Sequence, residues 1–277
     1  MHTYEGSIMA RKASQADVET RRQIEEVLFE AACTIKLRKK DLLKWPDDDE
    51  HLHQYRISVR VARSLVKFLK PYQDASQNQR LKANLKALQD PTSRMRELDV
   101  LVPLLAGYPE LQEQCRQVQL QTRGEFIAQL EQPETAAIHD AVEHDLKHLS
   151  WCKAVCEDGI DADKLAERIN ARKDACEQAI TQVDWNNQEA VHDLRKQAKA
   201  VRYISRELNP ALPCGIEAVS VQMREMQDKL GAWCDARVNA ALITEICGAA
   251  GAELAAQYQA EAEAMIAEMK STQTKET

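Results

Sequence analysis

Residues 51–70 read HLHQYRISVRVARSLVKFLK, and residues 190–208 read AVHDLRKQAKAVRYISREL. In both stretches a histidine is followed by basic residues at alternating spacings of three and four. The two patterns are His53-x2-Arg56-x3-Arg60-x2-Arg63 and, 139 residues later, His192-x2-Arg195-x3-Lys199-x2-Arg202. Because chance rarely repeats a pattern of this length, an internal duplication is the better explanation. We expect two repeats, each a bundle of about four helices.

The composition favours an all-α fold. Of 277 residues, only 8 are glycine and 8 are proline, while 44% are hydrophobic, which is enough to bury a core. Few glycines and aromatic residues argue against turn-rich β folds and glycine-dependent nucleotide folds. Periodicity and breakers predict helices over 14–44, 51–70, 81–89, 99–131 with a break near Gly107 and Pro109, 134–157, 161–181, 188–208, 217–230 with Gly231 as C-cap, and from there to about 270.

These helices predict one domain over 14–270. Its first repeat covers 14–157 and includes a central linker helix, and its second covers 158–270. Residues 1–13 and 271–277 are expected to be terminal tails.

Each basic pattern forms a stripe on one side of its helix, because residues three and four apart share a face. The two stripes are His53, Arg56, Arg60, Arg63 and Lys67, and His192, Arg195, Lys199, Arg202 and Arg206. A charged stripe is usually the solvated face of an amphipathic helix. The first stripe differs, because residues 52–69 contain no acidic residue and the stripe covers an arc of only about 80° on an otherwise apolar helix.

A helix that is apolar on nearly all sides should be buried on nearly all sides, and burying unpaired cations is costly. The stripes must therefore face water or an anion. Residues 53–70 carry a net charge of +5 and residues 192–206 carry +4, so with −7 for the whole chain the remainder carries −16. Two facing stripes would form a central cationic groove, for which a chain of phosphates is the natural ligand. Aromatic residues for base stacking are missing from the stripes, apart from Tyr203.

The patterns resemble the CHAD domain, the conserved histidine α-helical domain. The matching segments are 53–63 and 192–203, Arg96-Glu97-Leu98-Asp99-Val100, which is similar to the RDLDV-type motif of the family, and Met226-Gln227-Asp228-Lys229-Leu230-Gly231 with Asp235 beyond it, which is similar to its LQDxLG-to-D motif. The resemblance covers about residues 14–270. It implies two pseudo-symmetric four-helix bundles around a basic pore that binds inorganic polyphosphate. By motif alignment it adds Lys86, Arg96 and Arg224 to the expected binding residues.

The chain departs from the family pattern at three places. Glu97 stands where the family usually has aspartate, and Pro91-Thr92-Ser93 replaces the usual Leu-Gly helix ending. The ExExK pattern of the CYTH-type domain that many relatives carry is also missing, since Glu261-Ala262-Glu263 is not followed by a lysine in register.

Two further groups of residues could suggest metal chemistry. His144, His148, Cys152 and Cys156 follow one another at i, i+4, but four ligands along one helix would span about 18 Å, so structural roles are the better interpretation. His139-Asp140 and His192-Asp193 are similar to the doublet of HD-type metal phosphohydrolases. No ordered set of four ligands accompanies them.

The leading interpretation is a non-enzymatic module that binds polyphosphate and needs no cofactor or metal. Sulfate or phosphate could occupy its site in crystals, and polyphosphate granules or polyphosphate-metabolising enzymes are candidate partners. RNA or DNA binding by the same stripes and, less favoured, a metal-dependent phosphohydrolase remain alternatives. No signal peptide or membrane association is expected, and the cytoplasm is the expected compartment. Eight cysteines without a CxxC pair fit reduced thiols there.

Overall fold

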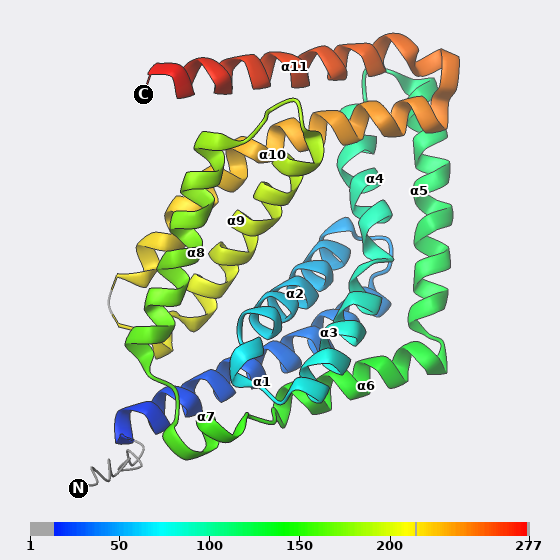
Figure 1. Cartoon of the computed structure of the whole chain (residues 1–277). Coiled ribbons are helices and arrows are strands. Elements are labelled where there is room, and N and C mark those ends of the chain that lie inside the picture. Colours follow the sequence, from blue (N-terminus) through cyan, green and yellow to red (C-terminus); the bar gives the residue numbers. More distant parts are fainter. Residues whose placement is uncertain (1–13, 214, 276–277) are drawn as a thin grey trace, which may run out of the picture.

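The expected all-α fold is confirmed by the computed structural model, which describes residues 14–213 and 215–275 (Figure 1). Among these residues the only β pairing is an isolated bridge between Gln73 and Trp151. The expected tail 1–13 and Cys214 lie outside the described residues. The elements are α1 Gln15–Lys44, α2 Asp49–Phe68, η1 Lys70–Tyr72, α3 Ala75–Gln89, α4 Thr92–Leu104, α5 Pro109–Leu130, α6 Pro133–Lys147, α7 Lys153–Asp158, α8 Ala162–Gln182, α9 Gln188–Leu208, η2 Asn209–Ala211, α10 Ile216–Cys247, η3 Gly248–Gly251 and α11 Ala252–Lys275.

The two stripe helices begin and end in the same way. Side-chain oxygens cap both N-termini, Asp48 on α2 and Asn187 on α9, and so satisfy backbone N–H groups of the first turn. Each helix then passes into a short 3-10 turn with proline at its second position, Pro71 in η1 and Pro210 in η2. Caps and prolines are each 139 residues apart, as the sequence patterns are. The duplication itself stays a prediction.

The prediction of a C-cap at Gly231 is wrong. Helix α10 continues without a break to Cys247, and Gly248, with a φ of 53°, follows its end. Gly231 is buried, and a Cβ there would lie 3.7 Å from a guanidinium nitrogen of Arg195. Gly231 therefore lies inside the helix next to an arginine of α9 and does not end the helix.

Four other helix boundaries differ from the predicted ones. The helix expected over 134–157 is divided, because α6 ends at Lys147 and Trp151 turns to pair with Gln73. Helix α3 begins at Ala75, where the side chain of Asp74 caps it. Helix α4 begins at Thr92, seven residues before the expected start, and so includes Arg96. Helix α11 extends to Lys275, beyond the expected end near 270.

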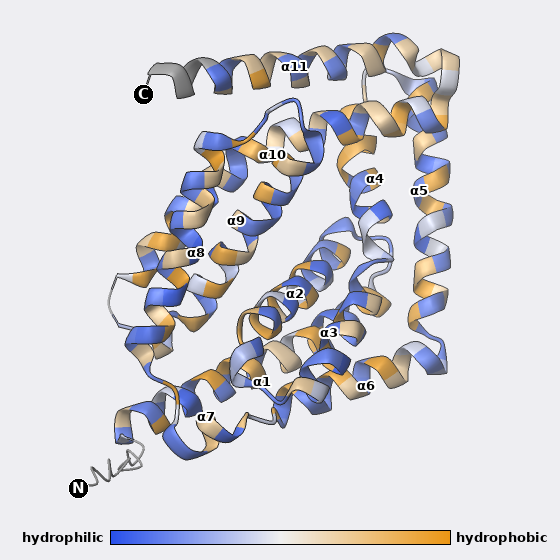
Figure 2. Cartoon of the chain, in the orientation of Figure 1, coloured by the Kyte–Doolittle hydropathy of each residue, from blue (hydrophilic) through white to orange (hydrophobic). Residues whose placement is uncertain are grey.

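Helix α2 lies at the centre of the fold. It packs against α1, α3 and α4 of its own half and against α9 of the other half. Helices α8, α9, α10 and α11 pack in succession, as Figure 1 shows. A large hydrophobic core joins the two halves, and a second, smaller one lies between α4, α5, α10 and α11. In Figure 2, hydrophobic and hydrophilic residues alternate along the helices, as amphipathic packing requires.

The apolar stretch Ile216–Lys270 belongs to this packing. By length and composition alone it could cross a membrane, yet 44% of its apolar window is buried inside the fold. Packing of α10 and α11 against each other accounts for much of this apolar surface.

The connection between α7 and α8 requires a glycine at position 159. Its φ is 76°, and a Cβ would lie 2.5 Å from the backbone carbonyl carbon of Asp17. We expect Gly159→Ala to lower the free energy of unfolding by about 1 to 3 kcal/mol for the backbone strain alone, with the clash adding to it. Denaturant titration measures this difference. Gly107→Ala, whose Cβ would meet nothing within 4 Å, is the control and should change stability by less than about 0.5 kcal/mol.

Candidate functional site

The two basic stripes meet where α2 packs against α9. On α2 the acidic first turn, with Asp49 and Glu50, suits the positive end of the helix dipole. Beyond it, the helical spacing places the basic side chains on one face. Six basic side chains from α2, α4 and α9 influence one another electrostatically, and we call them the central cluster. They are His53, Arg56 and Arg60 of α2, Arg96 of α4, and Arg195 and Lys199 of α9.

Lys199 shows how strongly the cluster is charged. Burial, followed by repulsion from Arg60, Arg195 and Arg56, lowers the pKa of Lys199 to about 7. Burial and then Arg60 lower the pKa of Arg56 to about 10. Burial and mutual repulsion both disfavour the charged forms of these side chains, and an anion beside them would oppose both effects.

The pKa values of His53 and Arg60 in the same cluster are lowered as well. The pKa of His53 lies below its usual value, because of burial first and Arg96 second. Burial also lowers the pKa of Arg60, although Tyr203 partly offsets that effect. Each of these shifts disfavours the charged form, so an anion placed here would reverse them.

Most of the central cluster has no acidic partner. Among the described residues, Arg56, Arg60 and Lys199 form no ion pair within 4.0 Å. The buried Nδ1 of His53 and the buried Nε atoms of Arg56 and Arg195 also have no hydrogen-bond partner. Buried donors without partners are costly. The arrangement therefore has the charge and the free donors that an anionic ligand would satisfy.

Two carboxylates lie at the edge of the cluster. A nitrogen of Arg195 lies 3.3 Å from an Asp235 oxygen. Burial raises the pKa of Glu97 and outweighs Arg94 and Arg56, whose positive charges stabilise the ionised carboxylate. Glu97, where the family usually has aspartate, still lies near arginine side chains. Two carboxylates leave most of the cluster charge uncompensated.

Neutral amides hold the next arginine of each stripe. Arg63 donates to the amide oxygen of Gln89 at 3.1 Å, and Arg202 donates to that of Gln227 at 3.0 Å. An amide fixes a guanidinium without neutralising it, as a carboxylate would. Sequence analysis missed Gln89, because nothing in its local pattern indicates a partner 26 residues away.

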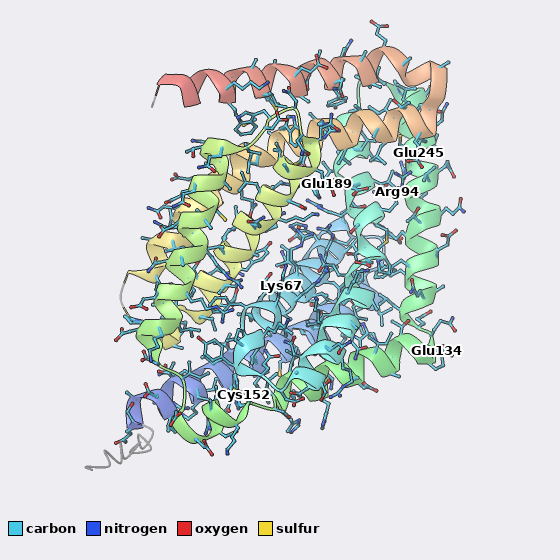
Figure 3. All side chains as sticks on the ribbon, viewed as in Figure 1. Lys67, Arg94, Glu134, Cys152, Glu189 and Glu245 are labelled. Carbon is cyan, nitrogen blue, oxygen red and sulfur yellow. The ribbon has the colours of Figure 1, made fainter. Side chains whose placement is uncertain are left out.

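The remaining predicted residues lie outside the central cluster. Lys67 and His192 are exposed, and Figure 3 shows Lys67 between α2 and α9. Lys86, Arg206 and Arg224 are exposed and form ion pairs with Asp90, Glu207 and Asp228. The structure thus brings six of the predicted side chains together and leaves these five at the surface. The expected central groove stays a prediction.

A buried ion-pair network fixes the helix that carries Arg96. Arg123 of α5 contacts Asp99 of α4 and Asp49 at the start of α2, and it donates to the Asp47 carbonyl at 2.9 Å. Gln119 donates to Asp99 at 2.7 Å. Arg94 of α4 also pairs with Glu245 of α10 at 2.7 Å, and both residues are labelled in Figure 3. Sequence analysis did not single out Arg123, since no motif contains it.

Apart from His192, whose pKa is lowered by burial and then by Lys196, Arg195 and Lys199, the histidines and cysteines considered for metal binding lie on α6, on α7 or between them. Helix α6 ends before His148, so the four residues from His144 to Cys156 do not share one helix as predicted. His139 is buried beside the hydroxyl of Tyr55 at 3.1 Å, and burial lowers its pKa to about 4. Within the described part of the chain, no three His, Cys, Asp or Glu residues lie close enough to hold a metal ion.

Comparison with known proteins places this arrangement in a family. The model of the CHAD domain matches residues 28–244. The crystal structure of the CHAD domain from the plant Ricinus communis is similar, with a TM-score of 0.70 and 18% identity over 95% of this chain and 89% of that one. PptA from Streptomyces chartreusis is similar with a TM-score of 0.69 and 14% identity over 92% of this chain and 97% of that one. Both similarities concern the fold, and no curated protein sequence matches.

The buried charge of Lys199 should cost stability when no ligand is bound. We expect Lys199→Met to raise the free energy of unfolding by about 1 kcal/mol or more, because an apolar side chain of similar length replaces a repelled cation. Chemical denaturation measures the change. The control is Lys196→Met, an exposed lysine of the same helix paired with Asp193, which should change stability by less than about 0.5 kcal/mol.

The same lysine predicts a pH dependence. The folded protein loses the Lys199 proton near pH 7, while the unfolded chain keeps it to about 10.5. Because the unfolded state then binds more protons, stability should rise between about pH 7 and pH 8.5, by up to about 1 kcal/mol per pH unit. Lys199→Met should remove this rise. An equal slope in both proteins would contradict the low pKa of Lys199.

Proposed function

The chain belongs to the CHAD domain family, and we propose that it binds inorganic polyphosphate through the central cluster without catalysing a reaction on it. The observation that supports this most directly is the set of half-buried cations that α2, α4 and α9 bring together without enough acidic partners. A ligand with closely spaced negative charges along a chain matches that set.

Each residue type has its own part in this binding. The guanidinium groups of Arg56, Arg60 and Arg195 can each donate two parallel hydrogen bonds to a phosphate group. Lys199 adds a point charge and takes up a proton as the ligand arrives, because a nearby anion raises its pKa. The ligand also supplies acceptors for the free donors of His53 and Arg56.

The flanking cations favour a polymer over a single phosphate ion. The first stripe extends from His53 to Lys67, which is about 21 Å along the helix. Arg63 and Arg202 keep their full charge beside neutral amides. A chain of phosphates could contact the central cluster and these flanking side chains at once, whereas a single phosphate could reach only part of them.

Nucleic acid is the less suitable polymer. Tyr203, the aromatic residue of the stripes, is only 5% exposed and is therefore not free to stack on bases. Competition between polyphosphate and tRNA for the protein separates the two ligands, and displacement of polyphosphate by equal phosphate concentrations of tRNA would favour the nucleic-acid alternative.

The proposed ligand suggests a compartment and partners for this protein. We place it in the cytoplasm, with polyphosphate granules or enzymes that make or degrade polyphosphate as partners. Sulfate and phosphate share the charge and acceptor geometry of the polymer and would occupy the same side chains in crystals.

Charge reversal at the centre of the cluster should abolish binding. In the variant Arg60→Glu/Lys199→Glu, two cations become anions beside Arg56 and Arg195, so we expect polyphosphate affinity to fall at least about a hundredfold. Titration of the protein with polyphosphate at two salt concentrations measures this loss. The control variant Arg116→Glu/Lys153→Glu changes the same charges on exposed residues of α5 and α7 and should retain binding. Equal affinities in the two variants would contradict the proposed site.

The neutral amide beside Arg63 should matter for affinity more than for stability. We expect Gln89→Glu to weaken polyphosphate binding by about three- to tenfold, because the new carboxylate pairs with Arg63. The slope of the logarithm of affinity against the logarithm of salt concentration should fall by about 0.7 to 0.9, as expected for one lost phosphate contact. Thermal unfolding should show little loss of stability. Gln114→Glu, at an exposed position of α5, is the control. If Gln114→Glu lost as much affinity as Gln89→Glu, the proposed role of the Gln89 amide would be contradicted.

A further inference from the structure

A second pair of cations lies outside the central cluster, where the C-terminal end of α2 meets α8. The guanidinium carbon of Arg168 lies 5.0 Å from the ring centre of Phe68 and 5.6 Å from that of Tyr72. The guanidinium carbon of Arg172 lies 4.8 Å from the ring centre of Phe68. Two arginines one helical turn apart therefore share the same aromatic surface.

This pair has no acidic partner, although acidic residues are available on the same helix. Among the described residues, neither Arg168 nor Arg172 forms an ion pair within 4.0 Å. Their neighbour Lys173, in contrast, pairs with both Asp174 and Glu177. Burial, with Arg168 as the next cause, lowers the pKa of Arg172. Like charges one turn apart destabilise a helix. Helix stability therefore does not explain why Arg168 and Arg172 lie one turn apart.

The pair lies near the C-terminal end of the helix that carries the first basic stripe. Phe68 follows directly after Lys67, the last residue of that stripe, and Lys67 is exposed without an ion pair among the described residues. Lys70 follows in η1 and is exposed as well. A polymer leaving the central cluster along α2 towards its C-terminus would reach Lys67 first and the arginines of α8 next.

We propose that Arg168 and Arg172 form a second phosphate-binding subsite, which holds the part of a long polyphosphate chain that extends beyond the central cluster. This inference rests on the proposed function and adds a preference for long chains to it. Both guanidinium groups lie within cation–π distance of an aromatic ring, and a guanidinium in such a contact can still donate from its N–H edge. Such an edge binds two phosphate oxygens at once. Because the rings already hold the arginines in place, binding costs less side-chain entropy.

The test compares a short and a long ligand on the full chain. Tripolyphosphate is too short to reach beyond the central cluster, whereas a long-chain polyphosphate can contact both the central cluster and the pair Arg168 and Arg172. In Arg168→Gln/Arg172→Gln we expect the dissociation constant for tripolyphosphate to stay within about twofold, and affinity for the long chain to fall about tenfold. The salt dependence of long-chain binding should lose about 1.4 to 1.8 in slope, as expected for two phosphate contacts.

Two further variants separate binding from packing. Arg168→Lys/Arg172→Lys keeps the charges but loses the forked donors, so its long-chain affinity should lie between those of the parent protein and the glutamine variant, whereas a purely structural role on Phe68 and Tyr72 would make it as weak as the glutamine variant. Lys153→Gln/Lys164→Gln removes two exposed charges that have their own acidic partners and should bind both ligands as the parent protein does.

Other results would overturn the inference. Unchanged long-chain affinity in the glutamine variant would show that the pair does not bind phosphate. Equal losses for the short and the long ligand would show that the pair acts through the central cluster and not beyond it. If the parent protein binds neither ligand, the proposed function itself fails, and the subsite fails with it.

Discussion

Repulsion between like charges, held half-buried where two helices meet, is the interaction on which the rest of this structure depends. Arg56, Arg60 and Lys199 lie together with too few carboxylates to neutralise them. Such a cluster destabilises the folded state by itself, and it persists only because other contacts hold the helices in place. The large hydrophobic core and the network around Arg123 supply those contacts. Stability and binding are thus divided between different parts of the fold.

This division also explains why the cluster suits a polyanion. A protein that already holds its cations together does not have to reorganise them when the ligand binds. The ligand relieves repulsion and provides acceptors for donors that are free without it. The carboxylates of Asp235 and Glu97 are too few to compete with it, and the amides of Gln89 and Gln227 do not compete at all.

The parts of the fold that sequence analysis predicted depend on local signals. The limits of α2 and α9 follow from caps, prolines and helical periodicity, and the stripes follow from spacing along one helix. The family resemblance contributed Arg96, which the structure places beside His53. The parts that were missed depend on contacts between distant segments. Gly231 was predicted to end a helix, because a glycine inside a helix has the same local sequence as a C-cap. Lys86 and Arg224, which the alignment added to the site, each pair with an aspartate four residues later on the same helix, and their contact with a ligand stays a prediction.

A crystal structure with bound tripolyphosphate tests the central claim most directly. The account predicts phosphate groups within hydrogen-bonding distance of the guanidinium groups of Arg56, Arg60 and Arg195 and of Nζ of Lys199. Phosphate groups bound only to exposed cations such as Arg116 and Lys153, with the central cluster free of anions, would contradict it.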